Sequence, residues 1–179
     1  MRLFVALSLP GSVERNLWAY MEKLRRINPR AGRFTRRENL HLTLAFIGEA
    51  DREAARRIAM GLLELPSHEL SMALVGVGRF RSGILWVGLG EEEELGRMSL
   101  EARNLLRRLD IPFDEKPFRA HITLARDWRG SDPEELPALP QIRDLERKPL
   151  RASLFESYRN ERGAVCYRLI SPEEPGLRL

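Results

Sequence analysis

The sequence predicts an α+β fold made of two related halves. Segments with helical apolar spacing alternate with strand-like segments, and the later strands occur as pairs joined by short turns. Paired strands favour antiparallel or mixed sheets, because a doubly wound parallel sheet needs a long connection between successive strands. In addition, the similar segments HLTLAFI and HITLA begin at His41 and His121. Two copies are too few for a solenoid, so we expect two lobes within a single domain that spans residues 1–179.

Each element follows from its local pattern. Apolar runs bounded by Gly, Pro or Asn predict strands, and apolar residues that recur every three or four positions predict helices. Ser12 and Asp51 can cap the first two helices, which Asn28-Pro29 and Pro66 end. The expected order is a strand at 2–9, a helix at 13–27, a strand at 40–48, a helix at 52–65, paired strands at 70–80 and 83–90, a helix at 95–109, a strand at 118–126, a loop with one helical turn at 127–140, and paired strands at 150–160 and 164–172.

Composition and charge exclude several classes of protein. The content of hydrophobic residues, 43%, is that of a folded domain, and no apolar run approaches the roughly 18 residues of a membrane span. The start, MRLFVALSLPGS, lacks the basic region of a signal peptide and leads directly into patterned sequence. The single cysteine, Cys166, excludes an intramolecular disulfide and suits a reducing compartment. We therefore expect a cytoplasmic monomer with no membrane partner.

The basic residues are almost all arginines. Lys23, Lys116 and Lys148 are the only lysines among 30 basic residues, and the formal net charge is +4. Arginine suits phosphate because its guanidinium group can donate to two oxygens at once. An arginine-biased base composition or a warm habitat explains the excess equally well. The excess is therefore compatible with a nucleic-acid partner but does not establish one.

The first of the two similar segments places a histidine and a threonine on one face of a strand. If side chains alternate strictly along HLTLAFI, His41 and Thr43 point one way, and Leu42, Leu44 and Phe46 point the other way. We expect the leucine face to pack against the helices, which directs the His–Thr pair toward an open sheet face or a cleft. Phe46 is accordingly interpreted as a core residue.

The second segment repeats this arrangement. His121 and Thr123 share one face of HITLA, and Ile122 and Leu124 share the opposite one. The chain has only three histidines, and two of them stand in matching HxTL motifs, which a lone structural histidine would not explain. If two related lobes face each other, both His–Thr pairs converge on one volume. There, two imidazoles with pKa values near 6.5 can act as general acid and general base, and the threonine hydroxyls can donate to an anionic oxygen.

Other chemistries find less support in these residues. A catalytic zinc ion usually has three protein ligands, but the chain has no HExxH or CxxC motif and no carboxylate inside either HxTL motif. Nucleophilic catalysis lacks a GxSxG elbow, and Cys166 lies in a late predicted strand. His68, between a predicted helix and a predicted strand, has no counterpart and is interpreted as a surface or capping residue. We expect neither a metal ion nor a cofactor.

The paired HxTL motifs and their flanks resemble the 2H phosphoesterase superfamily, and within it the RNA 2′,3′-cyclic phosphodiesterase family, also called 2′-5′ RNA ligase. The resemblance covers the opening strand MRLFVALSLP, the motif blocks RRENLHLTLAFIGE and KPFRAHITLAR, the hairpin GRFRSGILWVGL between them and the last strands. It therefore spans nearly the whole chain. Arg37 and Ala120 stand where such sequences often have proline, a departure that concerns the shape of the loops before the motifs.

The resemblance implies two pseudo-symmetric lobes, each an antiparallel sheet with helices packed outside, that enclose a central groove. It also implies metal-independent hydrolysis of an RNA 2′,3′-cyclic phosphate end to a 2′-phosphate, with RNA such as tRNA fragments as the partner. His41 is then the proton donor and His121 the proton acceptor, while Thr43 and Thr123 hold the nonbridging oxygens. If an RNA 5′-hydroxyl replaced water, the same step would form a 2′-5′ linkage, so reversible ligation is a second outcome of one site.

Three basic residues are candidates for substrate binding. Arg36 and Lys116 each precede a motif histidine by five residues, which predicts a cation near the groove mouth in each lobe; ordinary solvated charge explains them equally well. Arg126 follows the second motif, as the resemblance implies, and could contact phosphate. Simple alternation puts Arg126 on the face opposite His121, so it needs a strand end or a twist to reach the groove.

Base recognition and the substrate itself stay open at this stage. Trp86 and Trp128 could stack a base, although burial of Trp86 in the predicted hairpin is the preferred interpretation. The same histidine pair could also act on a small cyclic nucleotide or on ADP-ribose 1″,2″-cyclic phosphate. A third hypothesis is a non-catalytic RNA-binding module with a basic groove, which would not need the histidines and would bind with a strong dependence on salt.

Overall fold

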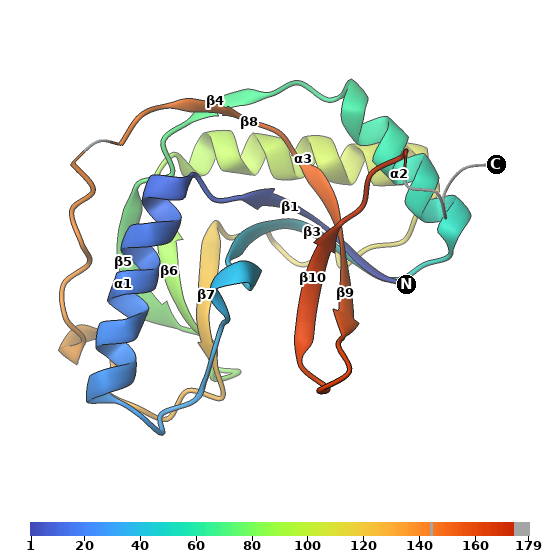
Figure 1. Ribbon diagram of the computed structural model, residues 1–179. Coiled ribbons are helices and arrows are strands. Elements are labelled where there is room, and N and C mark those ends of the chain that lie inside the picture. Colours follow the sequence, from blue (N-terminus) through green and yellow to red (C-terminus); the bar gives the residue numbers. More distant parts are fainter. Residues whose placement is uncertain (144, 174–179) are drawn as a thin grey trace.

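The computed structural model describes residues 1–143 and 145–173 of the chain (Figure 1). Helices and strands alternate in the first two thirds, and the last strands follow one another. In chain order the elements are β1 (Arg2–Ser8), α1 (Gly11–Ile27), β2 (Arg33–Phe34), a 3-10 turn (Arg37–Asn39), β3 (His41–Glu49), α2 (Arg52–Glu64), β4 (His68–Leu70), β5 (Leu74–Arg79), β6 (Leu85–Leu89), α3 (Glu92–Arg108), β7 (His121–Arg126), a second 3-10 turn (Pro133–Glu135), β8 (Lys148–Leu150), β9 (Ser153–Arg159) and β10 (Val165–Leu169).

The helices follow the sequence pattern, with one difference at the start of α1. Apolar residues at helical spacing form a buried stripe on each helix, and the Asp51 side chain caps α2 by accepting a hydrogen bond of 2.8 Å from the Ala54 amide. Helix α1 begins at Gly11, so Ser12 lies inside the first turn and is not the cap that the sequence predicts. The reason is that the carbonyl of Pro10 already accepts the first helical hydrogen bond.

Two predicted strands are each divided in the structure. The segment predicted as one strand at 70–80 forms β4 and β5, because Met72 between them has a left-handed backbone with φ of 55° that turns the chain. The segment predicted at 150–160 forms the end of β8 and then β9. The short strands β4 and β8 pair with each other in a separate two-stranded sheet. The helical turn within 127–140 and the final antiparallel pair agree with the prediction.

The main sheet joins two groups of strands. Its order is β10-β9-β1-β3-β7-β6-β5, with β2 attached to β7, and the pairings are antiparallel. Between β3 and β7, the register within the described residues contains the single pair Leu42–Ile122. We call this pair the seam. Because His41 and His121 directly precede the two seam residues, the topology brings both motifs to the junction of the groups.

Each group of strands has helices on its outer side (Figure 1). Helix α3 packs against β3 and α2 against β9, whereas α1 lies with the half that contains β5, β6 and β7. Strand β9 pairs with β1, so the first half is built from both ends of the chain and the two halves are interleaved. The prediction of an α+β fold with two lobes and antiparallel sheets is confirmed. No helix within 1–143 and 145–173 is long and apolar enough to cross a lipid bilayer.

Candidate active site at the seam

A β-bulge changes the direction of the side chains within the first motif. Strand β1 pairs Ala6 with Thr43 and Val5 with Ala45, so Leu44 is an extra residue without a partner on β1. An extra residue of this kind shifts the alternation of side chains by one position. Beyond the bulge, Ala45 therefore turns into the core, where it is 1% exposed.

The same bulge brings Phe46 to the face of His41 and Thr43. Phe4 pairs with Phe46 and Ala6 pairs with Thr43, and Phe4 and Ala6 point the same way because they are two residues apart on β1. Phe46 is 36% exposed and lines a pocket together with His41 and Thr43. The prediction that Phe46 is a core residue is therefore wrong, because strict alternation fails at the bulge.

The second motif contains a bulge at the equivalent position. Strand β6 pairs Trp86 with Thr123 and Leu85 with Ala125, which leaves Leu124 as the extra residue. Ala125 and Leu85 are both fully buried, so this part of β7 has also exchanged its faces. The two HxTL motifs thus have the same backbone irregularity, at the leucine three residues after the histidine.

Arg126 reaches the groove because of this second bulge. It follows His121 by five residues, as Phe46 follows His41, and each of the two residues lies just beyond a bulge. Arg126 lines two pockets that both include His41. The bulge reverses the alternation that puts Arg126 opposite His121, and Arg126 is also the last residue of β7, so it stands at a strand end.

Both motif histidines are held by the same backbone contact. Nδ1 of His41 lies 2.7 Å from the carbonyl oxygen of Asn39, and Nδ1 of His121 lies 2.8 Å from the carbonyl oxygen of Arg119. A carbonyl oxygen can only accept, so each Nδ1 carries a hydrogen and donates it. Nε2 is therefore the nitrogen of each ring that can exchange a proton with a ligand.

The surroundings lower the pKa of both imidazoles. At His41 the main cause of the lower pKa is burial; the Asn39 carbonyl opposes it, and the positive charges of Arg126 and His121 lower the pKa further. At His121 burial again dominates the lowering of the pKa; the Arg119 carbonyl opposes it, and the guanidinium groups of Arg119 and Arg126 add to it. Arg126 and His121 therefore lie within electrostatic range of His41, and one arginine acts on both rings.

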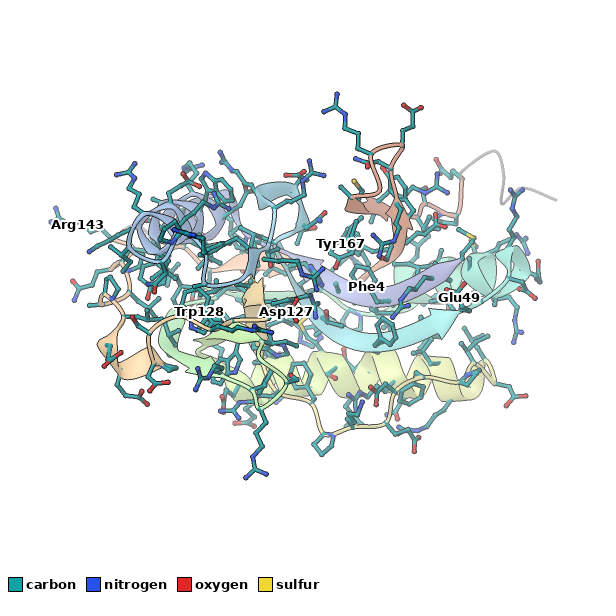
Figure 2. All side chains as sticks on the ribbon, turned by 90° about the horizontal axis from the view of Figure 1, so that it is seen from below. Phe4, Glu49, Asp127, Trp128, Arg143 and Tyr167 are labelled. Atoms are coloured by element: carbon teal, nitrogen blue, oxygen red, sulfur yellow. The ribbon has the colours of Figure 1, made fainter. Side chains whose placement is uncertain are left out.

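His41 is surrounded by side chains of the first half. Its Nε2 lies 2.9 Å from the hydroxyl oxygen of Thr43, and its ring centre lies 4.9 Å from that of Phe4 and 5.0 Å from that of Tyr167. Figure 2 shows Phe4 and Tyr167 next to each other at the centre of the molecule, and their ring centres are 4.9 Å apart. These three contacts restrict the orientation of the His41 imidazole.

His121 has aromatic neighbours too, but also a cation. Its ring centre lies 5.1 Å from that of Phe80 and 6.4 Å from that of Trp86. The guanidinium group of Arg119 lies 4.5 Å from the centre of the Trp86 ring. Trp86 is half-buried against Gly78, where a Cβ atom would overlap the indole, in agreement with the preferred interpretation of its role. In the described part of the chain, Nε2 of His121 has no hydrogen-bond partner.

Two adjoining pockets form a groove along the seam. Their volumes are about 540 Å³ and about 340 Å³, both within the range of roughly 300–1,000 Å³ that is typical of small-ligand sites. The first pocket is also lined by Thr43 and Phe46, and the second by Thr123 and Arg36. Both pockets share His41, Arg126, Arg159, Val165 and Tyr167. The groove thus contains groups from both motifs.

This arrangement can be compared with known proteins. The model of the family described as LigT like Phosphoesterase matches the chain twice, over residues 7–86 and 87–167. The chain belongs to the LigT-like phosphoesterases. Each match contains one HxTL motif, as each half of the structure does.

Relatives and solved structures agree with this assignment. The RNA 2′,3′-cyclic phosphodiesterase of Archaeoglobus fulgidus is 31% identical over 152 residues, which cover 83% of this chain and 80% of the relative. The crystal structure of E. coli LigT in its apo form is 26% identical and has a TM-score of 0.76, over 95% of this chain and 94% of that one. The crystal structure of E. coli LigT complexed with 3′-AMP covers the same shares with a TM-score of 0.71. The chain is therefore an enzyme of the phosphodiesterase class, as the sequence predicts.

The other candidate cations of this LigT-like phosphoesterase lie at different distances from the groove. Arg36 lines the smaller pocket and is paired with Glu38, with 3.1 Å between the charged groups. Lys116 is paired with Asp114 at 2.9 Å and lines neither pocket, and its side chain is 85% exposed. Arg36 thus lies at the groove, whereas Lys116 does not line it, and the cation beside His121 in the second motif's approach is Arg119.

His68 and Trp128 are both buried and are both hydrogen-bonded within the protein. His68 is buried, with Nδ1 2.5 Å from Glu94 and Nε2 2.8 Å from Glu101, so the interpretation as a surface or capping residue is wrong. Burial alone lowers the pKa of His68, but the two carboxylates outweigh it and the pKa is raised. Trp128 is 3% exposed and donates to the Ser131 carbonyl, so it has no free face for a base.

Sequence reasoning missed the part of the groove that the chain's ends supply. Phe4, Arg159 and Tyr167 all line the groove beside His41. Alternation along β1 could have predicted which face of the strand Phe4 occupies. Only the pairing of β9 with β1 shows that the last hairpin lies beside the first motif. Among residues 1–143 and 145–173, no group of three His, Cys, Asp or Glu side chains could hold a metal ion.

Proposed function

We propose that this chain hydrolyses the 2′,3′-cyclic phosphate at the 3′ end of RNA and leaves a 2′-phosphate. The observation that supports this most is the pairing of two imidazoles with identical Nδ1–carbonyl contacts, His41 and His121, on either side of the seam and near one arginine, Arg126. The curated relative from Archaeoglobus fulgidus is named for this activity. The groove contains His41 and Arg126, and His121, which lines a separate pocket with Phe80 and Arg119, lies within electrostatic range of both. Two proton-transfer groups near an arginine suit an anionic diester.

His121 is the general base in this proposal. Its Nε2 has no protein partner among the described residues, and burial together with the charges of Arg119 and Arg126 lowers its pKa. The ring is therefore neutral at neutral pH and can accept a proton. It takes that proton from a water molecule while the water oxygen forms a bond to phosphorus.

His41 is the general acid. The free protein lowers its pKa, but a bound phosphate brings a negative charge that favours the protonated ring. In the protonated state Nε2–H donates either to Thr43 or to the leaving group. As the bond between phosphorus and the 3′ oxygen breaks, His41 gives its proton to that oxygen, and the phosphate stays on the 2′ position. After this step His121 is protonated and His41 is neutral. Proton exchange with water returns both histidines to their starting states.

Arg126, Thr43 and Thr123 stabilise the charge that develops on the nonbridging oxygens. Arg126 lines both pockets, and the two threonines line one pocket each beside His41. Donors already in position before the reaction stabilise a developing charge without reorganisation. If the 5′-hydroxyl of a second RNA replaces water, the same transfers form a 2′-5′ linkage, so ligation is a second outcome of this proposal.

The test is product analysis on a defined RNA. A short RNA with a 2′,3′-cyclic phosphate end is incubated with the protein and excess EDTA, and the product is identified by chromatography against 2′- and 3′-phosphate standards. We expect a 2′-phosphate with EDTA present. A 3′-phosphate product, or turnover that depends on added metal ions, would contradict the mechanism. Comparison of this RNA with ADP-ribose 1″,2″-cyclic phosphate separates the proposed substrate from the small-molecule alternative.

A further inference from the structure

The hairpin of β9 and β10 forms one wall of the groove and extends below β1 in Figure 1, and in the sheet β1 and β3 lie between it and β7. In this hairpin Arg159 pairs with Val165, and Ser157 pairs with Tyr167. Paired residues on antiparallel strands share a face, and so do residues two positions apart. All four side chains therefore lie on the face of the hairpin that lines the groove.

Arg159 is positioned but its charge is not neutralised. One of its guanidinium nitrogens donates a hydrogen bond of 2.7 Å to the carbonyl of Gly163 across the hairpin turn. No carboxylate of the described residues forms an ion pair with it. Two other arginines of the groove differ, since Arg33 is paired with Asp127 at 2.6 Å and Arg36 with Glu38. The remaining N–H groups of Arg159 are therefore available to an anionic ligand.

Along the hairpin, Arg159 stands one strand step away from the residue that contacts His41. Tyr167 contacts the His41 ring, and Val165, the partner of Arg159, lies two residues farther along β10. Two residues of an antiparallel strand extend about 6.8 Å. This is the scale of one nucleotide in an extended single strand. Between the two positions, the Tyr167 ring and the Val165 side chain offer an apolar surface suited to a sugar or a base.

We propose that Arg159 binds the phosphodiester that joins the terminal nucleotide of the RNA to its 5′ neighbour, while Arg126 binds the cyclic phosphate. This inference rests on the proposed function and adds to it a preference for RNA ends of two or more nucleotides over a mononucleotide. A nucleoside 2′,3′-cyclic phosphate has only a 5′-hydroxyl at that point. It therefore cannot make the charge-assisted hydrogen bonds to Arg159 that a phosphodiester makes.

The experiment compares two substrates that differ in this one group. Adenosine 2′,3′-cyclic phosphate and the dinucleotide ApA with a 2′,3′-cyclic phosphate are given to the wild type and to Arg159→Gln, and the ratio of their kcat/KM values is measured. We expect the dinucleotide to be preferred by the wild type, and the ratio to fall roughly tenfold in Arg159→Gln. Arg159→Lys keeps the charge without the planar fork and is expected to have an intermediate ratio.

Arg162→Gln is the matched control. Arg162 lies in the turn of the same hairpin and lines neither pocket, so the ratio is expected to stay at the wild-type value. An Arg159→Gln ratio equal to that of the wild type would overturn the inference, and so would an equal fall in Arg162→Gln. If the wild type hydrolyses neither substrate, the proposed function fails first. If it hydrolyses both and only the ratio is insensitive to Arg159, this inference alone fails.

Discussion

The two halves of the molecule present the same backbone with different side chains. In each half a strand begins with a histidine, bulges at the leucine three residues later and aims the residue beyond the bulge at the groove. In each half a main-chain carbonyl two residues before the histidine holds its Nδ1. The difference lies at Nε2, which is bonded to Thr43 in the first half and has no described partner in the second.

This difference separates orientation from chemical role. The repeated backbone gives both rings the same tautomer and exposes the same nitrogen. In the proposed mechanism, the side chains around the rings determine which of them holds its proton. The pKa of both rings is lowered, mainly by burial and further by the charge of Arg126. The hydroxyl beside Nε2 of His41 can accept a hydrogen bond from the protonated ring, and the charge of Arg119 acts in addition on His121. The asymmetry agrees with an acid in the first half and a base in the second.

The largest expected loss of activity comes from removing either imidazole. We expect His41→Ala and His121→Ala each to lower kcat by roughly 10²–10⁴-fold, because each removes one proton transfer from the transition state. The double variant is expected to lose little more than either single variant, since the two groups act as a unit. Turnover of an RNA 2′,3′-cyclic phosphate end measures this. A single variant with wild-type kcat would remove that histidine from the mechanism.

Arg126→Gln tests the one charge that both halves share. Without it we expect kcat to fall roughly 10²-fold. Arg126 lowers the pKa of both histidines, so its removal raises both pKa values and moves the bell-shaped pH profile of kcat/KM to higher pH. In the wild type both limbs are expected at lower pH than ordinary histidine would give. A profile that does not move, with Arg162→Gln as control, would contradict the electrostatic effect of Arg126 on both rings.

A smaller effect distinguishes the two threonines. Thr123→Val removes one donor to the phosphate, for which we expect roughly a tenfold lower kcat. Thr43→Val removes a donor and also the partner of His41 Nε2, so a larger loss and a change in the limb of the pH profile that belongs to the acid are expected. Equal losses with unchanged profiles in the two variants would mean that the asymmetry at Nε2 has no chemical role.

The third histidine supplies the smallest effect, on stability and not on turnover. The raised pKa of His68 means that folding favours its protonated form beside Glu94 and Glu101. This contribution is fully present below the unfolded pKa near 6.5 and is lost as the pH rises through the higher folded value. We expect His68→Gln to lower Tm by a few degrees at pH 6 and by less at pH 9, with kcat retained. A Tm difference that grows with pH would contradict this.

The sequence predicts the parts of the site that depend on local pattern. The alternation of His and Thr with Leu, repeated in two segments, places His41 and Thr43 on one face and His121 and Thr123 on another. It cannot predict the bulges, because a bulge is defined by the register with a neighbouring strand, and β1 and β6 are remote from the residues they pair with. Strict alternation therefore places Phe46 on the wrong face and Arg126 on the face opposite His121, because it takes no account of the two bulges.

Other features depend on contacts between distant parts of the chain. The sequence around His68 does not indicate its two carboxylate partners, because Glu94 and Glu101 lie on α3 and contact His68 only in the folded chain. Arg159 is one of many arginines in the sequence, and its place in the groove follows from the pairing of β9 with β1. The fold class and the lobes could be predicted because duplication and paired strands leave a pattern in the sequence.

The seam has a mechanical consequence. A rotation of one half relative to the other displaces each atom in proportion to its distance from the pivot, and the pair Leu42–Ile122 is the point where β3 and β7 are joined. His41 and His121 stand one residue from that point, whereas the turn of the β9–β10 hairpin lies farther from β3 and β7 (Figure 1). Such a scissor motion would widen or narrow the outer groove around RNA of different shapes and leave the spacing of the two imidazoles nearly constant.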